Sequence, residues 1–246
     1  MNAAKLALIG YGGEGLGTPL SAETLNRVLD AAGLPSGASA LDLGCGCGQG
    51  AVLLASRGLR VTAVERHPEV AAAARERARP CLPAVHVVCA EASDLDAGER
   101  HDLVVALGAG ALAGRGAEPA QVLAFLAERT RAGGRVLWGE TFWRRPPSPL
   151  LQAVAGQAGR YGSHADYVRA GVSAGLIPLH AGESSQAEWD DYVFRYVRAL
   201  ELYALGNPDD ADAEPMRNRA RAWRDLYLAE AREVMGFGLY LFGRPA

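Results

Sequence analysis

The sequence predicts a doubly wound α/β fold, in which helices cover both faces of a mainly parallel β-sheet. The first observation behind this prediction is the alternation of short β-rich runs with Ala- and Leu-rich helical segments between residues 40 and 180. The second is a loop of alternating glycines, which follows the first of these runs and precedes a helical segment. A strand, a tight glycine turn and a helix start form a unit that binds nucleotide-like cofactors in such folds.

The N-terminal region, residues 1–35, is expected to contain a flap followed by a helix. Five glycines surround Tyr11 between residues 10 and 17. This composition favours a mobile flap over a ligand, and a floppy leader is the alternative. Ser21 is expected to begin a helix because apolar residues follow it at helical spacing, and Gly33 is expected to end that helix.

The elements of the central region are placed by their composition and by the turn signals between them. The runs expected to form strands are residues 41–43, 60–65, 85–89, 103–107 and 135–139, with a weaker strand at 176–180. The segments expected to form helices are residues 49–57, 68–78, 118–131 and 165–174.

The C-terminal region departs from this alternation. Ser185 and Glu188 have the spacing of a capping box, which predicts a helix to about residue 205. Pro215 is expected to open a second helix that ends near Gly236, and residues 238–242 are expected to form the closing strand. We therefore expect one domain, residues 1–246, with a helical cap of residues 184–235 inserted before the last strand.

Composition excludes several classes of protein. The chain has 246 residues and a formal net charge of −3, so it carries no basic footprint for nucleic acid or an anionic membrane. No apolar stretch is long enough to span a bilayer, and no secretion signal is visible, which predicts a cytoplasmic protein. The cysteines at 45, 47, 81 and 89 have neither zinc-site nor disulfide spacing, so no metal is expected. They are interpreted as small packing residues, with a redox or metal role for Cys45 and Cys47 as the alternative.

The glycine loop fits one cofactor pattern better than another. Asp42, Gly44, Gly46 and Gly48 match the pattern D-x-G-x-G-x-G. The dinucleotide pattern G-x-G-x-x-G/A fits only when it is forced onto Gly46, Gly48 and Ala51. A second signal is Glu65, which ends the next β-rich run, 17 residues after Gly48. A carboxylate there can accept both hydroxyls of a ribose, so the pair of signals indicates an adenosine-containing ligand.

These residues resemble the first motif of the class I S-adenosylmethionine (SAM) dependent methyltransferases, and the resemblance extends over nearly the whole chain. More narrowly, the chain is similar to a bacterial branch of uncharacterised small-molecule methyltransferases. The segments that carry this similarity are Thr-Pro-Leu-Ser at 18–21, Gly-Glu-Thr-Phe-Trp-Arg at 139–144, Glu-Trp-Asp-Asp-Tyr at 188–192 and Met-Gly-Phe at 235–237. The resemblance implies a Rossmann-like sheet of seven strands with the last one antiparallel, SAM as the cofactor, and methyl transfer to a small molecule.

The resemblance also implies a set of cofactor-binding residues. Glu91 and Ala92 match the segment that holds adenine, and Leu107 lies at the border between cofactor and acceptor. Gly110 and Ala111 stand where the branch carries a hydroxyl residue and a large aromatic residue, so we expect a wider pocket there. The full set of expected cofactor contacts is Asp42, Gly44, Cys45, Gly46, Gly48, Glu65, Arg66, Glu91, Ala92 and Leu107.

The acceptor side of the site is expected around the end of the fifth strand. Glu140 is interpreted as a carboxylate that orients the acceptor or acts as a base, and a salt bridge to Arg144 or Arg145 is the alternative. The expected acceptor contacts are Tyr11, Trp143, Trp189 and Tyr192, although aromatic residues at helical spacing are also typical of a core. His164 and His180 are further candidate bases, or ordinary solvent or core histidines.

Three other functions stay open at this point. The first is a protein of the same fold that uses SAM for chemistry other than methyl transfer. The second is an NAD-dependent oxidoreductase, against which Asp42 inside the motif argues. The third is a non-catalytic binding protein. Nucleic acid is disfavoured as acceptor, because the Asn/Asp-Pro-Pro-aromatic motif of amino-methylating enzymes is absent and the net charge is −3.

Overall fold

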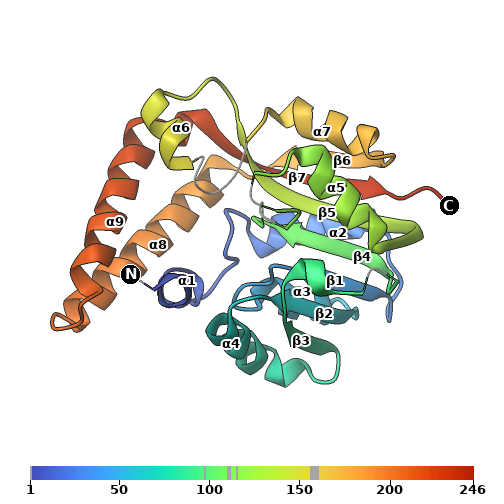
Figure 1. The fold of residues 1–246 in the computed structure, drawn as a ribbon, viewed down its shortest axis with the longest axis horizontal. Helices are drawn as coiled ribbons and strands as arrows, with labels where there is room; N and C mark the ends of the chain where they lie inside the picture. Colours follow the sequence, from blue (N-terminus) through green and yellow to red (C-terminus); the bar gives the residue numbers. More distant parts are fainter. Residues whose placement is uncertain (1, 97, 110–111, 115, 156–160) are drawn as a thin grey trace.

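The computed structural model describes residues 2–96, 98–109, 112–114, 116–155 and 161–246 (Figure 1). Its centre is one sheet of seven strands in the order β3-β2-β1-β4-β5-β7-β6. Strand β7 pairs antiparallel with both β5 and β6, and the other pairings are parallel. The predicted doubly wound sheet with an antiparallel last strand is therefore confirmed. The strands are β1 (Ser39–Leu43), β2 (Arg60–Glu65), β3 (Val85–Cys89), β4 (His101–Leu107), β5 (Thr130–Trp143), β6 (Ile177–Glu183) and β7 (Met235–Gly243).

This strand order has a switch point between β1 and β4. From β1 the chain first builds outward through β2 and β3, and it then returns to build β4 and β5 on the other side. Connections that leave neighbouring strands in opposite directions open a crevice beyond the carboxyl ends of those strands, and ligands bind there. The topology thus predicts where the site lies before any side chain is considered.

Helices cover both faces of the sheet, and the strands alternate between the two resulting cores (Figure 1). In β1, Ala40 packs into the core under α2 and α3, whereas Leu41 and Leu43 pack into the core under α5 and α7. A period of two is what a strand buried on both faces requires. The helices of these two layers are α2 (Ala22–Ala32), α3 (Gln49–Ser56) and α4 (Pro68–Ala78) on one face, and α5 (Pro119–Glu128) and α7 (His164–Ser173) on the other.

A third group of helices lies beyond the carboxyl ends of the strands (Figure 1). It consists of α1 (Ala3–Tyr11), α8 (Gln186–Gly206) and α9 (Ala213–Leu226). Helix α8 packs along α9, and α1 contacts both α8 and α4. The capping box that was predicted at Ser185 and Glu188 is present at the start of α8. None of the helices in the described ranges is long and apolar enough to cross a membrane.

The N-terminal region differs from the expectation for a flap. Residues 3–11 form helix α1, which Asn2 caps through its side-chain oxygen. The run Ala-Ala-Lys-Leu-Ala-Leu-Ile has high helix propensity, and the glycines that suggested a flap come mostly after it. Irregular chain is confined to residues 12–20, and α2 then begins after Ser21 and ends at Gly33 in the left-handed region, as predicted.

Other differences concern β5 and the last third of the chain. Strand β5 extends to Trp143, so Glu140 lies inside the strand and not at its tip. The final helix, expected to end near Gly236, ends at Val234, but α9 (Ala213–Leu226) is followed by a π-helical turn at Tyr227–Ala231 and the short α10 (Arg232–Val234) before β7 begins at Met235. The short elements η1 (Arg79–Cys81), η2 (Ala92–Asp94) and α6 (Pro149–Ala155) were not expected.

Candidate functional site

The glycine loop connects β1 to α3 in a conformation that only glycine adopts readily. Gly44, Gly46 and Gly48 have φ angles of 72°, 55° and 86°, in the left-handed region. A Cβ at Gly44 would lie 2.9 Å from the Cβ of Ala109, and one at Gly48 would lie 3.1 Å from the Cα of Ala74. Around Gly46, in contrast, no atom of the described residues would lie within 4 Å. Close neighbours therefore exclude a side chain at Gly44 and Gly48, whereas the space beside Gly46 is open.

Asp42 lies beneath this loop as a buried acid. Its side chain is 4% exposed, and Oδ2 has no hydrogen-bond partner within the described ranges. A Cβ on Gly50 would lie 3.4 Å from Oδ2, which places the carboxyl group under the first turn of α3. Burial, and then the charge of Glu65, raise the pKa of Asp42 to about 7. A positively charged ligand in the loop would offset this desolvation.

Glu65 ends β2 and is 8% exposed. Its Oε1 accepts a hydrogen bond of 2.9 Å from the backbone nitrogen of His67, the residue before α4. Within the part of the chain that the structure describes, Oε2 has no protein partner, so it is available to a ligand. The carboxylate is thus oriented by one bond and keeps an oxygen for a hydroxyl donor.

The remaining expected cofactor residues lie at the same edge of the sheet. Arg66 and Glu91 follow β2 and β3 on the surface, with their side chains 3.9 Å apart, and Ala92 is 8% exposed. Leu107 ends β4 next to Gly108. Cys45 is buried within the loop, and all four cysteines are free. The parallel pairing among strands β1, β2, β3 and β4 brings these separate segments together.

This set of residues fits an adenosine-containing cofactor that carries a positive charge. The open space beside Gly46 gives room for a close approach, the unpartnered Oε2 of Glu65 suits a ribose hydroxyl, and the unpartnered Oδ2 of Asp42 suits a nearby cation. Both predicted signals, the loop and the spaced acid, therefore point to one location.

Glu140 is a second buried acid, in β5. Its side chain is 6% exposed, Oε1 accepts a 2.8 Å bond from the backbone nitrogen of Thr141, and Oε2 is buried without a partner among the described residues. Burial raises the pKa of Glu140 to about 7. The alternative of a salt bridge to a neighbouring arginine is not what forms: Arg144 pairs with Glu183 at 3.3 Å and Arg145 with Glu233 at 3.4 Å.

Glu140 and Trp143 leave β5 on opposite faces. Trp138, Glu140 and Phe142 share the face toward α7, whereas Trp143 packs against the core on the other face. Tyr161 interacts electrostatically with Glu140 and through its ring with Trp143. Burial, and next the charge of Glu140, raise the pKa of Tyr161, and the Tyr161 ring meets the Trp143 ring edge-on at 5.6 Å.

An aromatic wall lines the inner side of α8. The Tyr11 ring at the end of α1 stacks on Tyr192 and Tyr196, with centroids 5.9 and 5.1 Å apart. Trp189 meets Tyr192 edge-on at 6.1 Å and is 3% exposed, with a buried Nε1 that has no partner in the described ranges. Tyr192 and Tyr11 are only partly buried, so the wall is core at Trp189 and accessible at the two tyrosines.

The histidine candidates lie elsewhere. His164 begins α7, and its Nδ1 lies 2.9 Å from the hydroxyl of Tyr240. His180 lies on the edge strand β6. Gly110 and Ala111, on which the expectation of a wider pocket rests, fall outside the described residues. Sequence reasoning missed Tyr161, because no local pattern marks a residue that only the tertiary fold brings to Glu140 and Trp143.

The comparisons with known proteins agree with this geometry. Residues 40–134 match the family model described as a methyltransferase domain. A SAM-dependent methyltransferase from Thiobacillus denitrificans, solved with S-adenosyl-L-homocysteine, is 24% identical, with 98% of this chain and 99% of that chain covered and a TM-score of 0.85. A SAM-dependent methyltransferase from Geobacter sulfurreducens, also solved with S-adenosyl-L-homocysteine, is 22% identical, with 98% of each chain covered and a TM-score of 0.85. YJHP from E. coli is 25% identical, with 97% and 98% covered and a TM-score of 0.81. The comparison with curated proteins finds no match.

The sheet order, the glycine loop and the matched methyltransferase domain together give the chain the fold of the class I SAM-dependent methyltransferases. The methyltransferase domain at residues 40–134 supports an enzyme with SAM as its cofactor, as the resemblance predicted. This assignment replaces the NAD-dependent oxidoreductase that the sequence had left open.

Proposed function

We propose that the enzyme transfers the methyl group of SAM to a small-molecule acceptor, held between the carboxyl ends of β4 and β5 and the inner side of α8. One observation carries the proposal: the aromatic wall adjoins the glycine loop. The carbonyl of Tyr11 accepts a 2.7 Å bond from Nε2 of Gln49, the residue directly after Gly48. An acceptor packed on the tyrosines would therefore lie next to a donor bound in the loop.

On the cofactor side, we propose that the loop and the strand ends hold SAM as the sequence suggested. Gly44, Cys45, Gly46 and Gly48 provide the backbone cradle, and Asp42 provides a compensating negative charge beneath it. Glu65 binds the ribose, with Arg66 beside it. Glu91 and Ala92 flank the adenine, and Leu107 borders the acceptor. Bound SAM supplies an already activated methyl group, so the main tasks of these residues are to position it and to exclude water.

On the acceptor side, we propose that Tyr11, Tyr192, Trp143 and Trp189 form the walls of the pocket, within a cap of residues 184–235. Glu140 is proposed to keep a proton or release it according to the acceptor, because its pKa of about 7 permits both forms at neutral pH. Tyr161 is proposed as a further residue on this side, because its ring meets the Trp143 ring edge-on and the charge of Glu140 contributes to its raised pKa.

The proposal extends to a cytoplasmic enzyme that does not act on nucleic acid. Four free cysteines, two of them buried in the glycine loop, are typical of a reducing compartment. The formal net charge of −3 gives no general attraction to phosphates.

The test combines binding with product analysis. Calorimetry should show that the purified chain binds SAM and S-adenosylhomocysteine (SAH). Incubation with SAM and a panel of amines, phenols, thiols and carboxylic acids should yield SAH and a methylated product in equal amounts. A product that forms without consumption of SAM would indicate the alternative, SAM-dependent chemistry other than methyl transfer. Absence of SAM binding would overturn the proposed site.

A further inference from the structure

Residues 12–20, here called the N-terminal strap, run between the glycine loop and α8. On the loop side, two residues hold the beginning of the strap. Gln49 donates through Nε2 to the carbonyl of Gly13 at 3.2 Å, in addition to Tyr11. Arg77 of α4 bridges the two segments: its Nε donates to the carbonyl of Cys47 at 2.9 Å and its Nη2 to the carbonyl of Gly12 at 2.6 Å. The strap is thereby fixed to the backbone of the cofactor loop.

On the α8 side, one arginine holds the middle of the strap. Arg195 donates through Nη1 to the carbonyl of Glu14 at 2.7 Å, and its Nη2 lies 3.4 Å from the carbonyl of Leu16. Asp191, one turn earlier, accepts from Nε of Arg195 at 2.7 Å and orients the guanidinium. The backbone carbonyls of an irregular segment need hydrogen-bond donors, and Arg195 provides these donors from α8.

The strap is shaped to receive this side chain. Gly15 lies between the two carbonyls that Arg195 binds, with φ of 78°. A Cβ at Gly15 would lie 2.6 Å from Nη1 of Arg195. The backbone conformation therefore favours glycine at this position, and any side chain there would displace the guanidinium of Arg195.

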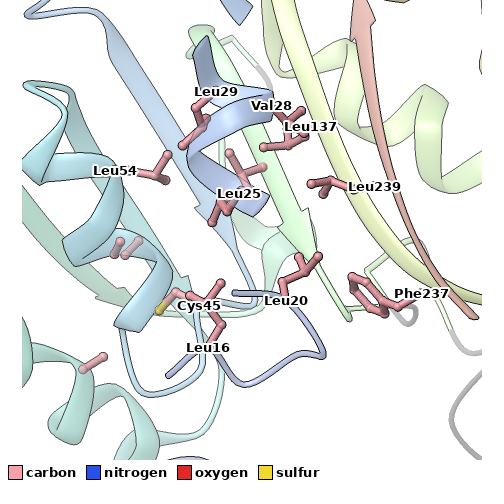
Figure 2. Close-up of a cluster of buried hydrophobic side chains, with 14 of the residues drawn as sticks. Leu16, Leu20, Leu25, Val28, Leu29, Cys45, Leu54, Leu137, Phe237 and Leu239 are labelled. Carbon is pink, nitrogen blue, oxygen red and sulfur yellow. The ribbon is translucent and has the colours of Figure 1, made fainter. Parts of the chain in front are cut away.

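Beyond Gly15, the strap packs against the glycine loop and the end of β4. Leu16 and Leu20 belong to the same buried cluster as Cys45, and Figure 2 shows Leu16 beside that cysteine. Thr18 is 8% exposed and its Oγ1 has no partner among the described residues. The Cγ2 of Thr18 would lie 2.9 Å from a Cβ on Gly108, the residue after β4. The strap thus lies against the glycine loop at the switch point of the sheet.

We propose that Arg195 is a positioning residue for the cofactor: it clamps the N-terminal strap against the glycine loop and so retains SAM. The inference rests on the proposed cofactor site. Because Arg195 and Tyr192 both belong to α8, the same clamp couples the retention of SAM to the position of the aromatic wall. Release of the cofactor then requires the strap to leave Arg195.

The experiment compares Arg195→Ala with Arg198→Ala, using SAH as the probe. Arg198 is an exposed arginine of the same helix, and its side chain makes no hydrogen bond or ion pair within the described ranges. Stopped-flow measurement should show SAH dissociating about tenfold faster from Arg195→Ala, since charge-assisted bonds to the strap are lost. Hydrogen exchange of residues 12–17 should also become faster, with an unchanged far-UV spectrum. Arg198→Ala should behave as the wild type.

A second variant tests the clamp without removing its charge. Gly15→Ala should displace the guanidinium and speed SAH dissociation, and its effect should shrink in the Arg195→Ala background, where the steric conflict is gone. Unchanged SAH dissociation and unchanged strap exchange in Arg195→Ala would overturn the inference while leaving the proposed function intact. A wild-type chain that binds no SAH would overturn the proposed function itself.

Discussion

At the scale of single residues, Glu65 is the side chain whose predicted role the structure makes most specific. One oxygen is committed to the backbone of His67 and the other is free in the described part of the chain. Glu65→Gln keeps the size of the side chain but removes its charge. We expect a loss of SAM affinity of about tenfold or more, because a hydrogen bond to a charged group contributes roughly 1.5–3 kcal/mol. Calorimetry checks this, with Glu69→Gln on the exposed first turn of α4 as the control.

The two buried acids predict a pH dependence of stability. The pKa values of Asp42 and Glu140, both about 7, lie above the ordinary values of 3.8 and 4.5. The folded state therefore holds protons that the unfolded state has released, so its free energy of unfolding falls as the pH rises from about 4.5 to about 7.

The effect is isolated by comparison with Glu140→Gln, which cannot titrate. Urea unfolding without ligand should show the wild type losing stability relative to this variant as the pH rises from about 5 to 7, by up to about 1.4 kcal/mol for each pH unit. Parallel pH profiles of the two proteins would show that Glu140 is ionised throughout this range.

Asp42 adds a linked prediction for the cofactor. A positive ligand in the glycine loop favours the ionised carboxylate, so binding releases a proton wherever Asp42 is protonated in the free enzyme. SAM affinity should therefore rise between about pH 6 and pH 8 and then level. In Asp42→Asn, calorimetry should give a flatter profile. A wild-type affinity independent of pH would contradict the raised pKa.

At the scale of elements, α8 packs on its neighbours through the same face that carries the aromatic wall. Trp189 is 3% exposed and stacks on Tyr227 with centroids 6.3 Å apart, so it is a core residue as well as a wall residue. Trp189→Ala should cost about 3–5 kcal/mol of unfolding free energy, because it leaves a large cavity. Leu202→Ala, at a position 60% exposed on the same helix, should cost almost nothing. Equal effects in urea unfolding would place Trp189 outside the core.

The elements also show what the sequence could predict. The strands and α-helices of residues 39–107 were located to within about two residues, because their alternation, caps and glycines are local signals. The length of β5 was not predictable, since it is set by pairing with β7, where Trp143 lies opposite Met235. For the same reason the sequence placed Glu140 and Trp143 together, whereas a continuous strand sends them to opposite faces.

The same limit applies to the candidate site. The loop, Asp42 and Glu65 carry a motif and a spacing, so they were found without a structure. The clamp of Arg195 on Glu14 joins residues from opposite ends of the chain. Nothing in the local sequence of α8 marks that arginine, and only the φ angle of Gly15 and its contact with the guanidinium explain the conspicuous glycine.

At the scale of the whole molecule, the charges of α8 and α9 decide whether a polyanion could bind. Helix α9 is rich in arginine, which by itself would suggest a nucleic-acid surface. The arginines are, however, already engaged. Glu201 lies 3.6 Å from Arg217 and 3.0 Å from Arg221, and Arg219 donates to the hydroxyl of Tyr196 at 2.9 Å. Together with the net charge of −3, this pairing offsets part of the positive charge of α9.

We therefore expect no tight binding of RNA or DNA by the 246-residue chain. In a gel-shift assay at low salt, neither a single-stranded nor a duplex oligonucleotide should be retained at micromolar protein. Glu201→Gln provides a matched variant, because it removes the charge that neutralises two arginines and should raise any weak retention. If the protein bound the phosphates of a nucleic acid, its affinity for the oligonucleotide would fall steeply as the salt concentration rises, since each neutralised phosphate releases a counterion. Such a salt dependence in the wild type would overturn the small-molecule proposal. Its absence, with SAM bound in the same buffer, would direct the search for the acceptor to small molecules.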